Sequence, residues 1–388
     1  MADYFKESLD LHESFRGKIS VTPKMSVETK DDLSRVYSPG VAAPCKEIAE
    51  DPSSVWKYTI KGNTVAIVTD GSAVLGLGNI GPHAALPVME GKAMLFKKFA
   101  GIDAFPICLD TQNTDEIVET VRRIAPTFGG INLEDIAAPR SFEVESRLQD
   151  LGIPVFHDDQ HGTAIVVLAA LINASKLVGK DLASLHVVIN GAGAAGIAIA
   201  RLLRCITHDP NQCISVQEVV ICDSKGIIHR GRPDLNQAKQ EVLGYSNRSN
   251  ITGSLQDALV GADVFIGVSK GNLLTASDVS TMAKDPIIFA IANPIPEIMP
   301  AEAYKGGAAV VGTGRSDLPN QVNNVLGFPG IFRGALDVRA SQITPKMKLA
   351  AAYAIADSIN TPTREMVIPN ALDEEIAGKV AEAVAAAA

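Results

Sequence analysis

The sequence predicts an α/β protein whose second half is a Rossmann-like, doubly wound dinucleotide-binding domain. Short apolar, β-branched segments alternate with segments of helical apolar spacing, a pattern typical of a parallel sheet with helices on both faces. A glycine-rich segment, GAGAAG at 191–196, follows an expected strand and opens an expected helix. The chain has 388 residues, which fits two or three domains of ~150 residues each.

Composition excludes several classes of protein. Lys and Arg number 35 against 44 Asp and Glu, a net charge of −9 without a basic block, so neither nucleic acid nor an anionic membrane is expected as a partner. The longest apolar run, 164–172, is far shorter than the ~20 residues that span a bilayer. The charged N-terminus does not resemble a signal peptide. Five cysteines form no CxxC pair, so we expect neither a disulfide framework nor a zinc site, and a cytoplasmic location.

The first part of the chain should form an α/β unit preceded by short helices. Residues 1–60 carry amphipathic stretches interrupted by four prolines. A buried strand then ends at Asp70-Gly71, and four glycines between 71 and 81 predict a long loop. Further along we expect strands at 64–70, 103–110, 130–136 and 153–156, and helices at 89–100, 115–124 and 141–150.

The pattern changes near residue 160, which divides the chain into expected domains at 1–160 and 161–388. A long apolar helix at 163–177 leads into the strand that precedes GAGAAG. The alanine-rich segment from Pro345 onward predicts terminal helices. Strands of the second domain are expected at 185–190, 218–223, 263–268, 287–292 and 308–311.

The glycine-rich segment predicts binding of a nicotinamide dinucleotide. Glycines permit a tight turn and close backbone approach, so that a pyrophosphate can rest on the helix N-terminus. Asp223 closes the next strand, where a carboxylate accepts hydrogen bonds from the adenosine ribose and favours NAD over NADP. Ser224 and Lys225 follow directly, and Lys225 could receive the 2′-phosphate of NADP. The cofactor-binding residues are expected to be Gly191, Ala192, Gly193, Ala194, Ala195, Gly196 and Asp223.

Two acidic pairs form a second candidate site. Glu134-Asp135 and Asp158-Asp159 each follow a short apolar run, so they should lie near strand ends. Carboxylates without nearby cysteine are suited to Mg²⁺ or Mn²⁺ and not to zinc. From spacing alone, solvated helix caps are the more common explanation for such pairs. His157 and His161 flank the second pair, and a packing or orienting role is expected for them over a ligand role.

Several other polar residues are candidates only in combination. Tyr37 lies in VYSPG and Lys92 in MEGKAM, and each taken singly is explained as a surface residue. Lys92 lies on an apolar helix, where burial would lower its pKa toward that of a useful base. Asparagines in ANPIPE (292–297) and NQVNN (320–324) are either amide caps or donors to a small polar substrate.

Taken together, these segments resemble the malic enzyme family in its short bacterial form. They occur in the family's order and span residues 36 to 330, and INLED followed by HDDQHGTA is close to diagnostic. The segments are VYSPGVAAPC (36–45), VTDGSAVLGLGNIG (68–81), EGKAMLFKKFAGIDAFPI (90–107), INLEDIAAPR (131–140), VFHDDQHGTA (155–164), NGAGAAG (190–196), ANPIPE (292–297) and NQVNNVLGFPG (320–330).

The resemblance implies a role for each candidate. Lys92 would be the general base and Tyr37 the general acid, with Asp158 as a supporting carboxylate. In larger members of the family an arginine follows the DG of VTDG and binds a substrate carboxylate. Here Ser72 and Ala73 stand in that segment, and loop amides are our expectation for the missing partner. The resemblance assigns Glu134, Asp135 and Asp159 as metal ligands. It assigns Asn293, Asn323 and Asn324 to the binding of malate, and Asn293 also to the binding of the cofactor.

The resemblance implies metal-dependent oxidative decarboxylation of (S)-malate to pyruvate and CO₂ with reduction of NAD or NADP. It also implies an N-terminal malic-type catalytic domain and a homodimer. Three alternatives remain: a malolactic enzyme that releases lactate, a non-catalytic NAD-sensing protein, and a metal-free hydroxyacid dehydrogenase. The last two are disfavoured because the tyrosine, the lysine and the three carboxylates are all present.

Overall fold

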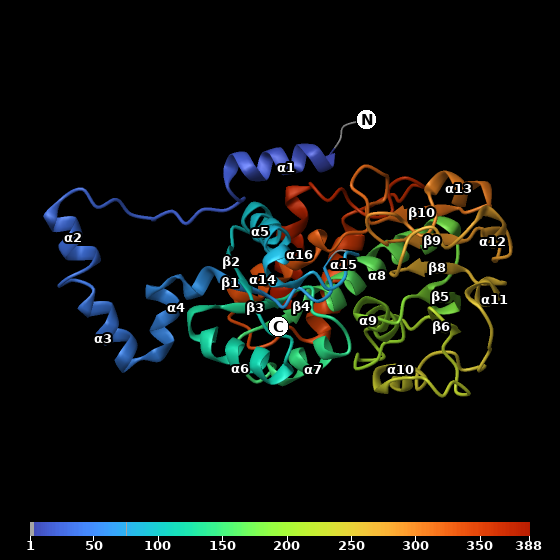
Figure 1. Cartoon of the computed structure of the whole chain (residues 1–388), viewed down its shortest axis with the longest axis horizontal. Coiled ribbons are helices and arrows are strands. Elements are labelled where there is room, and N and C mark those ends of the chain that lie inside the picture. The colour runs from blue at the N-terminus through green and yellow to red at the C-terminus, as the bar shows by residue number, and fades with distance from the viewer. Residues whose placement is uncertain (1–3, 75) are drawn as a thin grey trace.

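The computed structural model describes residues 4–74 and 76–388, so that Leu75 of the expected glycine-rich loop lies outside the described part. It contains one parallel sheet and one sheet that is parallel except for an edge strand, each with helices on both faces, and one long helix connects the two (Figure 1). An α/β fold with a Rossmann-like second half is therefore confirmed. The domain boundary near residue 160 stays a prediction.

The first sheet has four parallel strands in the order β2-β1-β3-β4. Every residue of β1, β3 and β4 is buried, which explains why these strands were recognisable as apolar runs. Between the strands run α5, α6 and α7. The bounds are β1 (Thr64–Thr69), β2 (Asp103–Cys108), β3 (Gly130–Leu133), β4 (Val155–His157), α5 (Gly81–Ala100), α6 (Thr114–Ile124) and α7 (Arg140–Arg147).

The second sheet has six strands in the order β10-β9-β8-β5-β6-β7. Numbered from β5 as one, this is the 3-2-1-4-5-6 order of a Rossmann fold with an antiparallel edge strand. That edge strand, β7, was not predicted because it has only two residues. The strands are β5 (His186–Asn190), β6 (Glu218–Asp223), β7 (Gly226–Ile227), β8 (Val264–Gly267), β9 (Ile287–Ala290) and β10 (Val310–Thr313), and the helices α9 (Ala194–Leu203), α10 (Gln237–Val242), α11 (Leu255–Leu259), α12 (Ala276–Ser280) and α13 (Pro300–Lys305).

Helix α8 (Asp158–Val178) runs from the first sheet into the second domain and begins five residues before the predicted start. The acidic pair Asp158-Asp159 therefore forms the first turn of this helix, where carboxylates interact favourably with the helix dipole. Within the described residues α8 is also the one helix long and apolar enough to cross a membrane. Its apolar window is 72% buried inside the protein, which is typical of a core helix.

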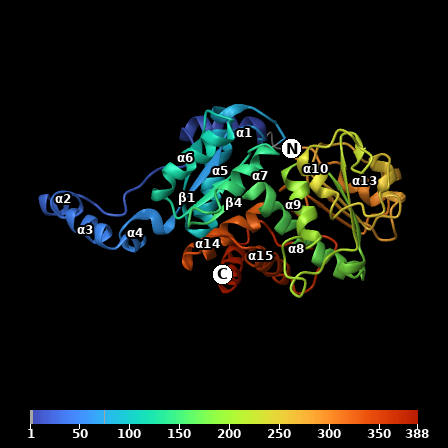
Figure 2. The ribbon, with the colours of Figure 1, turned by 90° about the horizontal axis from the view of Figure 1, so that it is seen from below.

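The C-terminal helices do not stay with the second sheet. Helix α14 (Phe328–Asp337) packs against α5, with ring centroids of Phe96 and Phe328 4.7 Å apart and those of Phe96 and Phe332 5.4 Å apart. Phe332 also contacts Phe156 of β4, at 5.9 Å. Helices α15 (Pro345–Asp357) and α16 (Glu374–Ala386) complete this group below the first sheet (Figure 2). The last part of the chain thus covers the sheet formed by the first part.

The N-terminal 60 residues include an arm that projects from the molecule. Helix α1 (Tyr4–Phe15) has no buried residue, and α2 (Lys30–Val36) and α3 (Ala42–Glu50) lie well away from the two sheets in both views (Figures 1 and 2). We call residues 19–54 the arm, and none of them is buried. The chain returns to the body through α4 (Val55–Tyr58) and the start of β1. The described residues also form the short 3₁₀ helices η1 (Pro52–Ser54), η2 (Ile60–Asn63), η3 (Ala125–Thr127), η4 (Leu182–Ser184) and η5 (Asn324–Leu326).

One expectation about cysteines is corrected. Cys205 and Cys213 form a disulfide, with Cα atoms 5.8 Å apart. The two residues flank the polar turn between α9 and β6, which brings them together although their spacing is not CxxC. The other cysteines, Cys45, Cys108 and Cys222, are free.

Candidate active site

The register of the first sheet places the two acidic pairs side by side. Leu133, the last residue of β3, pairs with His157, the last residue of β4. Because the strands are parallel, Glu134 and Asp158 leave the same edge of the sheet as neighbours. The expectation that these carboxylates lie at strand ends is thus met, and it follows from strand pairing.

Lys92 lies among these carboxylates. It is on α5, its side chain is 7% exposed, and its Nζ lies 2.8 Å from Glu134 Oε1 and donates a hydrogen bond to Asp158 Oδ2. The Nζ also lies 4.1 Å from the centre of the Phe328 ring, close enough for a cation–π contact. Asn132 Nδ2 donates to the second oxygen of Glu134 at 2.7 Å. The lysine and its two carboxylate partners therefore form a buried, fixed ion-pair cluster.

The pKa of Lys92 shifts in the direction opposite to that predicted. Burial alone lowers it, but the negative charges of Asp158, Glu134 and Asp159 together raise the pKa of Lys92 well above its ordinary value. Burial also raises the pKa of Asp158 and of Glu134, against the opposing effect of Lys92. The sequence showed an apolar helix around Lys92 and could not show three carboxylates facing it. Lys92 can act as a base only if another cation offsets the negative charge of these three carboxylates.

Glu134, Asp135 and Asp159 offer such a cation a place. One carboxylate oxygen from each lies within 4.8 Å of the others. Asp159 Oδ2 accepts a hydrogen bond from the Asp135 backbone N–H at 2.7 Å, which orients it. The buried Oδ1 of Asp158 lacks a hydrogen-bond partner among the described residues. An all-oxygen donor set of this kind fits Mg²⁺ or Mn²⁺.

The glycine-rich turn has the geometry of a dinucleotide site. Gly191 follows β5 with φ +129°, and a Cβ there would lie 2.8 Å from the Val268 carbonyl oxygen. A Cβ on Gly196 would lie 1.7 Å from the Gly191 carbonyl oxygen, so the turn closes only with glycine at both positions. Helix α9 starts without a side-chain cap, which leaves its first N–H groups for an anion. Ala192, Gly193, Ala194 and Ala195 complete this turn.

Asp223 ends β6, next to the strand that carries this turn, but it is not a free carboxylate. Arg232 donates to it at 2.7 and 3.1 Å and Lys239 at 2.6 Å. These hydrogen bonds outweigh the effect of burial and lower the pKa of Asp223 to about 2. Lys225, the alternative phosphate ligand, forms an ion pair with Asp234 at 2.8 Å. The two cations on Asp223 lie nine and sixteen residues further along the chain, and the sequence analysis missed them.

The candidate asparagines differ in position. Asn324 lies beside Gly162 of α8: a Cβ added to Gly162 would lie 3.2 Å from the Cβ of Asn324. The same added Cβ would lie 1.7 Å from the Asp158 carboxylate. Asn323 caps η5, with its Oδ1 accepting from the Val325 N–H at 2.9 Å, which is the capping role considered from the sequence. The Asn293 backbone carbonyl lies close to Gly76 of the glycine-rich loop. Asn293 and Asn324 thus extend the site toward the second domain.

Tyr37 does not lie with the other candidates. It ends α2 on the arm, and 69% of its surface is exposed. Within the described chain its hydroxyl has no hydrogen-bond partner. Figures 1 and 2 both show α2 well away from α5 and α8, which carry Lys92, Asp158 and Asp159. The structure therefore brings together the lysine and the carboxylates and leaves the tyrosine apart.

One arginine near the site was missed from the sequence. Arg140 donates to Asp70 Oδ2 at 2.7 and 3.1 Å and to Ser72 Oγ at 2.9 Å. Ala73 donates its N–H to the Asp135 carbonyl oxygen at 2.9 Å, so the loop passes directly over the carboxylate cluster. The sequence could have indicated Arg140, because it ends INLEDIAAPR, one of the segments that resemble the family. Its guanidinium shapes the loop in which loop amides are expected to meet the substrate.

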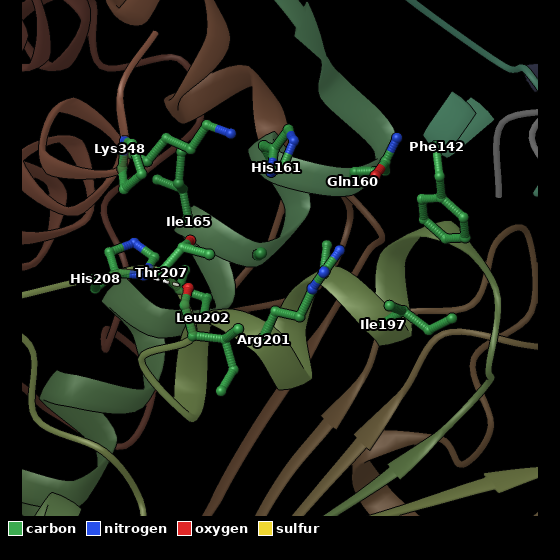
Figure 3. A pocket seen from close by; sticks show the side chains of 14 residues that line it. Phe142, Gln160, His161, Ile165, Ile197, Arg201, Leu202, Thr207, His208 and Lys348 are labelled. Carbon is green, nitrogen blue, oxygen red and sulfur yellow. Dashed lines mark hydrogen bonds between the residues drawn. The ribbon is translucent and has the colours of Figure 1, made fainter. Parts of the chain in front are cut away.

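A cavity of about 180 Å³ adjoins this cluster, between α7, α8, α9 and α15 (Figure 3). Gln160 and His161 line it from α8, Arg201 from α9 and Lys348 from α15. His161 Nε2 lies 2.9 Å from Glu145 Oε2, so this histidine is engaged with a carboxylate, in line with an orienting role. None of the predicted metal, base or cofactor residues lines the cavity.

Two family models together match most of the chain. Residues 16–149 match the family model "Malic enzyme, N-terminal domain" and residues 160–388 match "Malic enzyme, NAD binding domain". The chain is 59% identical to the bifunctional malic/malolactic enzyme of Bacillus subtilis, over 99% of this chain and 92% of that protein. It is 56% identical to the NAD-dependent malic enzyme of Geobacillus stearothermophilus, over 96% and 77% respectively.

Solved structures give the same result. The crystal structure of the NAD-dependent malic enzyme from Thermotoga maritima superposes with a TM-score of 0.93 at 49% identity, over 98% of this chain and 99% of that one. The malic enzyme of Entamoeba histolytica gives a TM-score of 0.92 at 40% identity, over 99% and 81%. The two domain models match residues of both sheets, and these relatives align with at least 96% of the chain. The chain belongs to the malic enzyme family.

Proposed function

We propose that in the NAD(P)-dependent oxidative decarboxylation of malate by this malic enzyme, Lys92 is the general base and Tyr37 the general acid. The observation that carries this proposal is the contact of Lys92 Nζ with Asp158 and Glu134 beside the three-carboxylate cluster. The proposed proton acceptor and the candidate cation ligands lie together at one sheet edge.

Lys92 acts on the first proton. Its Nζ, in the neutral form, takes the proton of the C2 hydroxyl of malate, and Asp158 and Glu134 hold the resulting ammonium in place. Glu134, Asp135 and Asp159 would hold a divalent cation, which would supply Lewis-acid polarisation of the substrate and offset the carboxylate charge around Lys92, and a bound nicotinamide would accept the hydride. Asp158 is proposed as a positioning residue, because its carboxylate accepts a hydrogen bond from the base, Lys92.

Tyr37 acts after CO₂ has left. Its hydroxyl would then donate a proton to C3 and give pyruvate. Asn293 and Asn324 would contact malate from the second domain, and loop amides near Ala73 would contact the substrate carboxylate that larger relatives bind with arginine. Asn323, already engaged as a helix cap, is the weakest of the three asparagine assignments.

NAD is the proposed preferred cofactor. Arg232 and Lys239 already form ion pairs with Asp223, so the 2′-phosphate of NADP would have to displace this carboxylate in order to bind them. The nearest cation in sequence, Lys225, is likewise paired with Asp234. The resident metal is proposed to be Mg²⁺ or Mn²⁺.

A malolactic reaction is the second candidate, because the Bacillus subtilis relative is described as bifunctional. The test incubates the protein with (S)-malate, Mn²⁺ and either NAD or NADP, follows the absorbance of reduced cofactor and identifies the organic product. Pyruvate with stoichiometric reduced cofactor is the expected result. Lactate without net reduction would favour the malolactic reaction, and no consumption of malate would contradict both.

A further inference from the structure

Two cations without an anionic partner line the cavity between α7, α8, α9 and α15. Arg201 reaches toward α8 from α9, and Lys348 does so from α15 (Figure 3). Among the described residues, neither side chain forms a hydrogen bond or an ion pair, and the Lys348 Nζ lies 5.8 Å from the centre of the Phe156 ring. No Asp or Glu is among the described residues that line the cavity. The cavity wall therefore carries positive charge that the protein itself does not neutralise.

The nearby carboxylate of Glu145 is already engaged. It lies 2.9 Å from His161 Nε2 and accepts the backbone N–H of His157 at 3.1 Å. Burial lowers the pKa of Lys348 against the opposing charge of Glu145, and the neighbouring charge of Arg201 lowers it further. Two like charges held close together in a partly enclosed space attract an anion.

A buried amide adds a third polar group to the same cavity. Gln160 lines it from the first turn of α8 and is 4% exposed. Its Nε2 is buried and has no hydrogen-bond acceptor among the described residues. A buried N–H group without an acceptor is unfavourable, so an oxygen atom of a bound molecule would supply the missing partner.

We propose that this cavity binds a small organic anion. Its phosphate or carboxylate group contacts Arg201, Lys348 and the Nε2 of Gln160, because a guanidinium matches the oxygen atoms of either group. The short apolar part of the anion lies against the side chains of Ile165 and Ile197, which also line the cavity. One water needs ~10–15 Å³ of such space, so a cavity of about 180 Å³ holds several non-hydrogen atoms besides the charged group.

The place of this cavity in the fold gives the site a further property. An anion held by Gln160 and Arg201 contacts the first turn of α8, which carries Asp158 and Asp159, together with α9, which begins at the glycine-rich turn. The inference does not depend on the proposed catalytic roles, because none of the residues given those roles lines the cavity.

Isothermal titration calorimetry with three probes tests the site: n-butyl phosphate, n-butyrate and inorganic phosphate. We expect at least one of the two organic anions to bind with a Kd below about 10 mM, and the comparison between them identifies the preferred charged group. Inorganic phosphate, which lacks the apolar part, should bind at least about tenfold more weakly than the better organic probe. Equal binding of inorganic phosphate would overturn the apolar half of the site.

Arg201→Gln and Lys348→Gln should each weaken binding of the organic probe by at least about tenfold. Neither substitution removes a hydrogen bond or an ion pair between described residues, so both variants should fold and should turn over malate at the wild-type rate without the probe. Lys346→Gln is the matched control, because it removes the same charge from an exposed position of α15 that does not line the cavity. Its binding of the probe should equal that of the wild type.

Ala198→Leu tests the cavity itself, because it keeps both cations and adds bulk to the part of the lining that α9 forms. This variant should lose binding while its circular dichroism spectrum stays that of the wild type. Absence of binding by both organic probes up to about 10 mM would overturn the site. Binding that is unchanged in Arg201→Gln and Lys348→Gln would place the anion elsewhere and overturn it as well. An equal loss in Lys346→Gln would show a non-specific attraction to surface charge, with the same consequence.

Discussion

Among single residues, Asp159 is the most direct test of the metal site. Its carboxylate is oriented by the Asp135 N–H, and its side chain is 32% exposed. Asp159→Asn removes one negative charge from the site without changing its shape. We expect the rate of oxidative decarboxylation to fall by more than the ~10–100-fold that follows loss of a residue that only hydrogen-bonds to a metal ligand. The Kd for NAD should not change. Asp150→Asn, at a surface carboxylate paired with Arg122, is the control; undiminished turnover of Asp159→Asn at low Mn²⁺ would remove Asp159 from the ligands.

Substitution of Asp223 tests the choice between NAD and NADP. Asp223→Asn removes the carboxylate that engages Arg232 and Lys239 and leaves both cations available to a 2′-phosphate. We expect the ratio of kcat/KM for NADP to that for NAD to rise by at least about tenfold, or ~1.4 kcal/mol. Steady-state kinetics with both cofactors measure it. An unchanged ratio would show that Asp223 does not discriminate between them.

The same carboxylate predicts a pH dependence of stability. Its pKa in the folded protein is about 2, below the ordinary value of 3.8, because Arg232 and Lys239 stabilise the charged form. A depressed pKa contributes stability above the unfolded-state pKa, and this contribution is lost as the pH falls through the folded-state value. The difference in free energy of unfolding between wild type and Asp223→Asn should therefore be constant from pH 7 to about 4 and shrink below it. Urea titrations over this range test it, and a gap that widens on acidification would contradict it.

At the level of elements, the first turn of α8 positions the base. Gly162 lies one turn after Asp158, and a Cβ there would lie 1.7 Å from Asp158 Oδ1. Gly162→Ala must therefore displace the carboxylate that holds Lys92. A displacement of about 1 Å at a reacting group can cost ~10²-fold in rate, and we expect a loss of that size in kcat. Gly378→Ala in α16, where no atom lies within 4 Å of the added Cβ, should retain wild-type kcat and bounds any general effect of alanine.

How far the elements could be predicted depended on burial. The strands of both sheets apart from β7 were recognisable because parallel strands covered on both faces are continuous apolar runs. The start of α8 was placed too late, since its first four residues, Asp158, Asp159, Gln160 and His161, are polar and lack helical apolar spacing. The two acidic pairs were recognisable as a candidate site because they follow strands, but only the resemblance to the family selected Glu134, Asp135 and Asp159 as the proposed metal ligands. The raised pKa of Lys92 and the ion pairs of Asp223 depend on residues distant in sequence, which no local pattern shows.

At the scale of the whole molecule, the order of the chain hides its packing. Composition and strand order divide the sequence near residue 160, but Phe328 and Phe332 return to pack on Phe96 of α5. The same α14 places Phe328 over Lys92, so the last part of the chain contributes to the site that the first part builds. Contacts over more than 200 residues leave no periodic signal, and only the resemblance of NQVNNVLGFPG to the family indicated that this segment reaches the site.

This packing predicts that the C-terminal helices stabilise the first sheet. Phe332 is fully buried and contacts both Phe96 and Phe156. Phe332→Ala leaves a cavity between α14, α5 and β4, and should lower the free energy of unfolding by ~3–5 kcal/mol. Leu372→Ala, at a side chain that is 75% exposed, should change it by less than about 0.5 kcal/mol. Urea unfolding monitored separately by circular dichroism and by fluorescence of Trp56, which packs near the first sheet, measures both variants. A loss no larger for Phe332→Ala than for Leu372→Ala would mean that the first sheet is stable without its C-terminal cover.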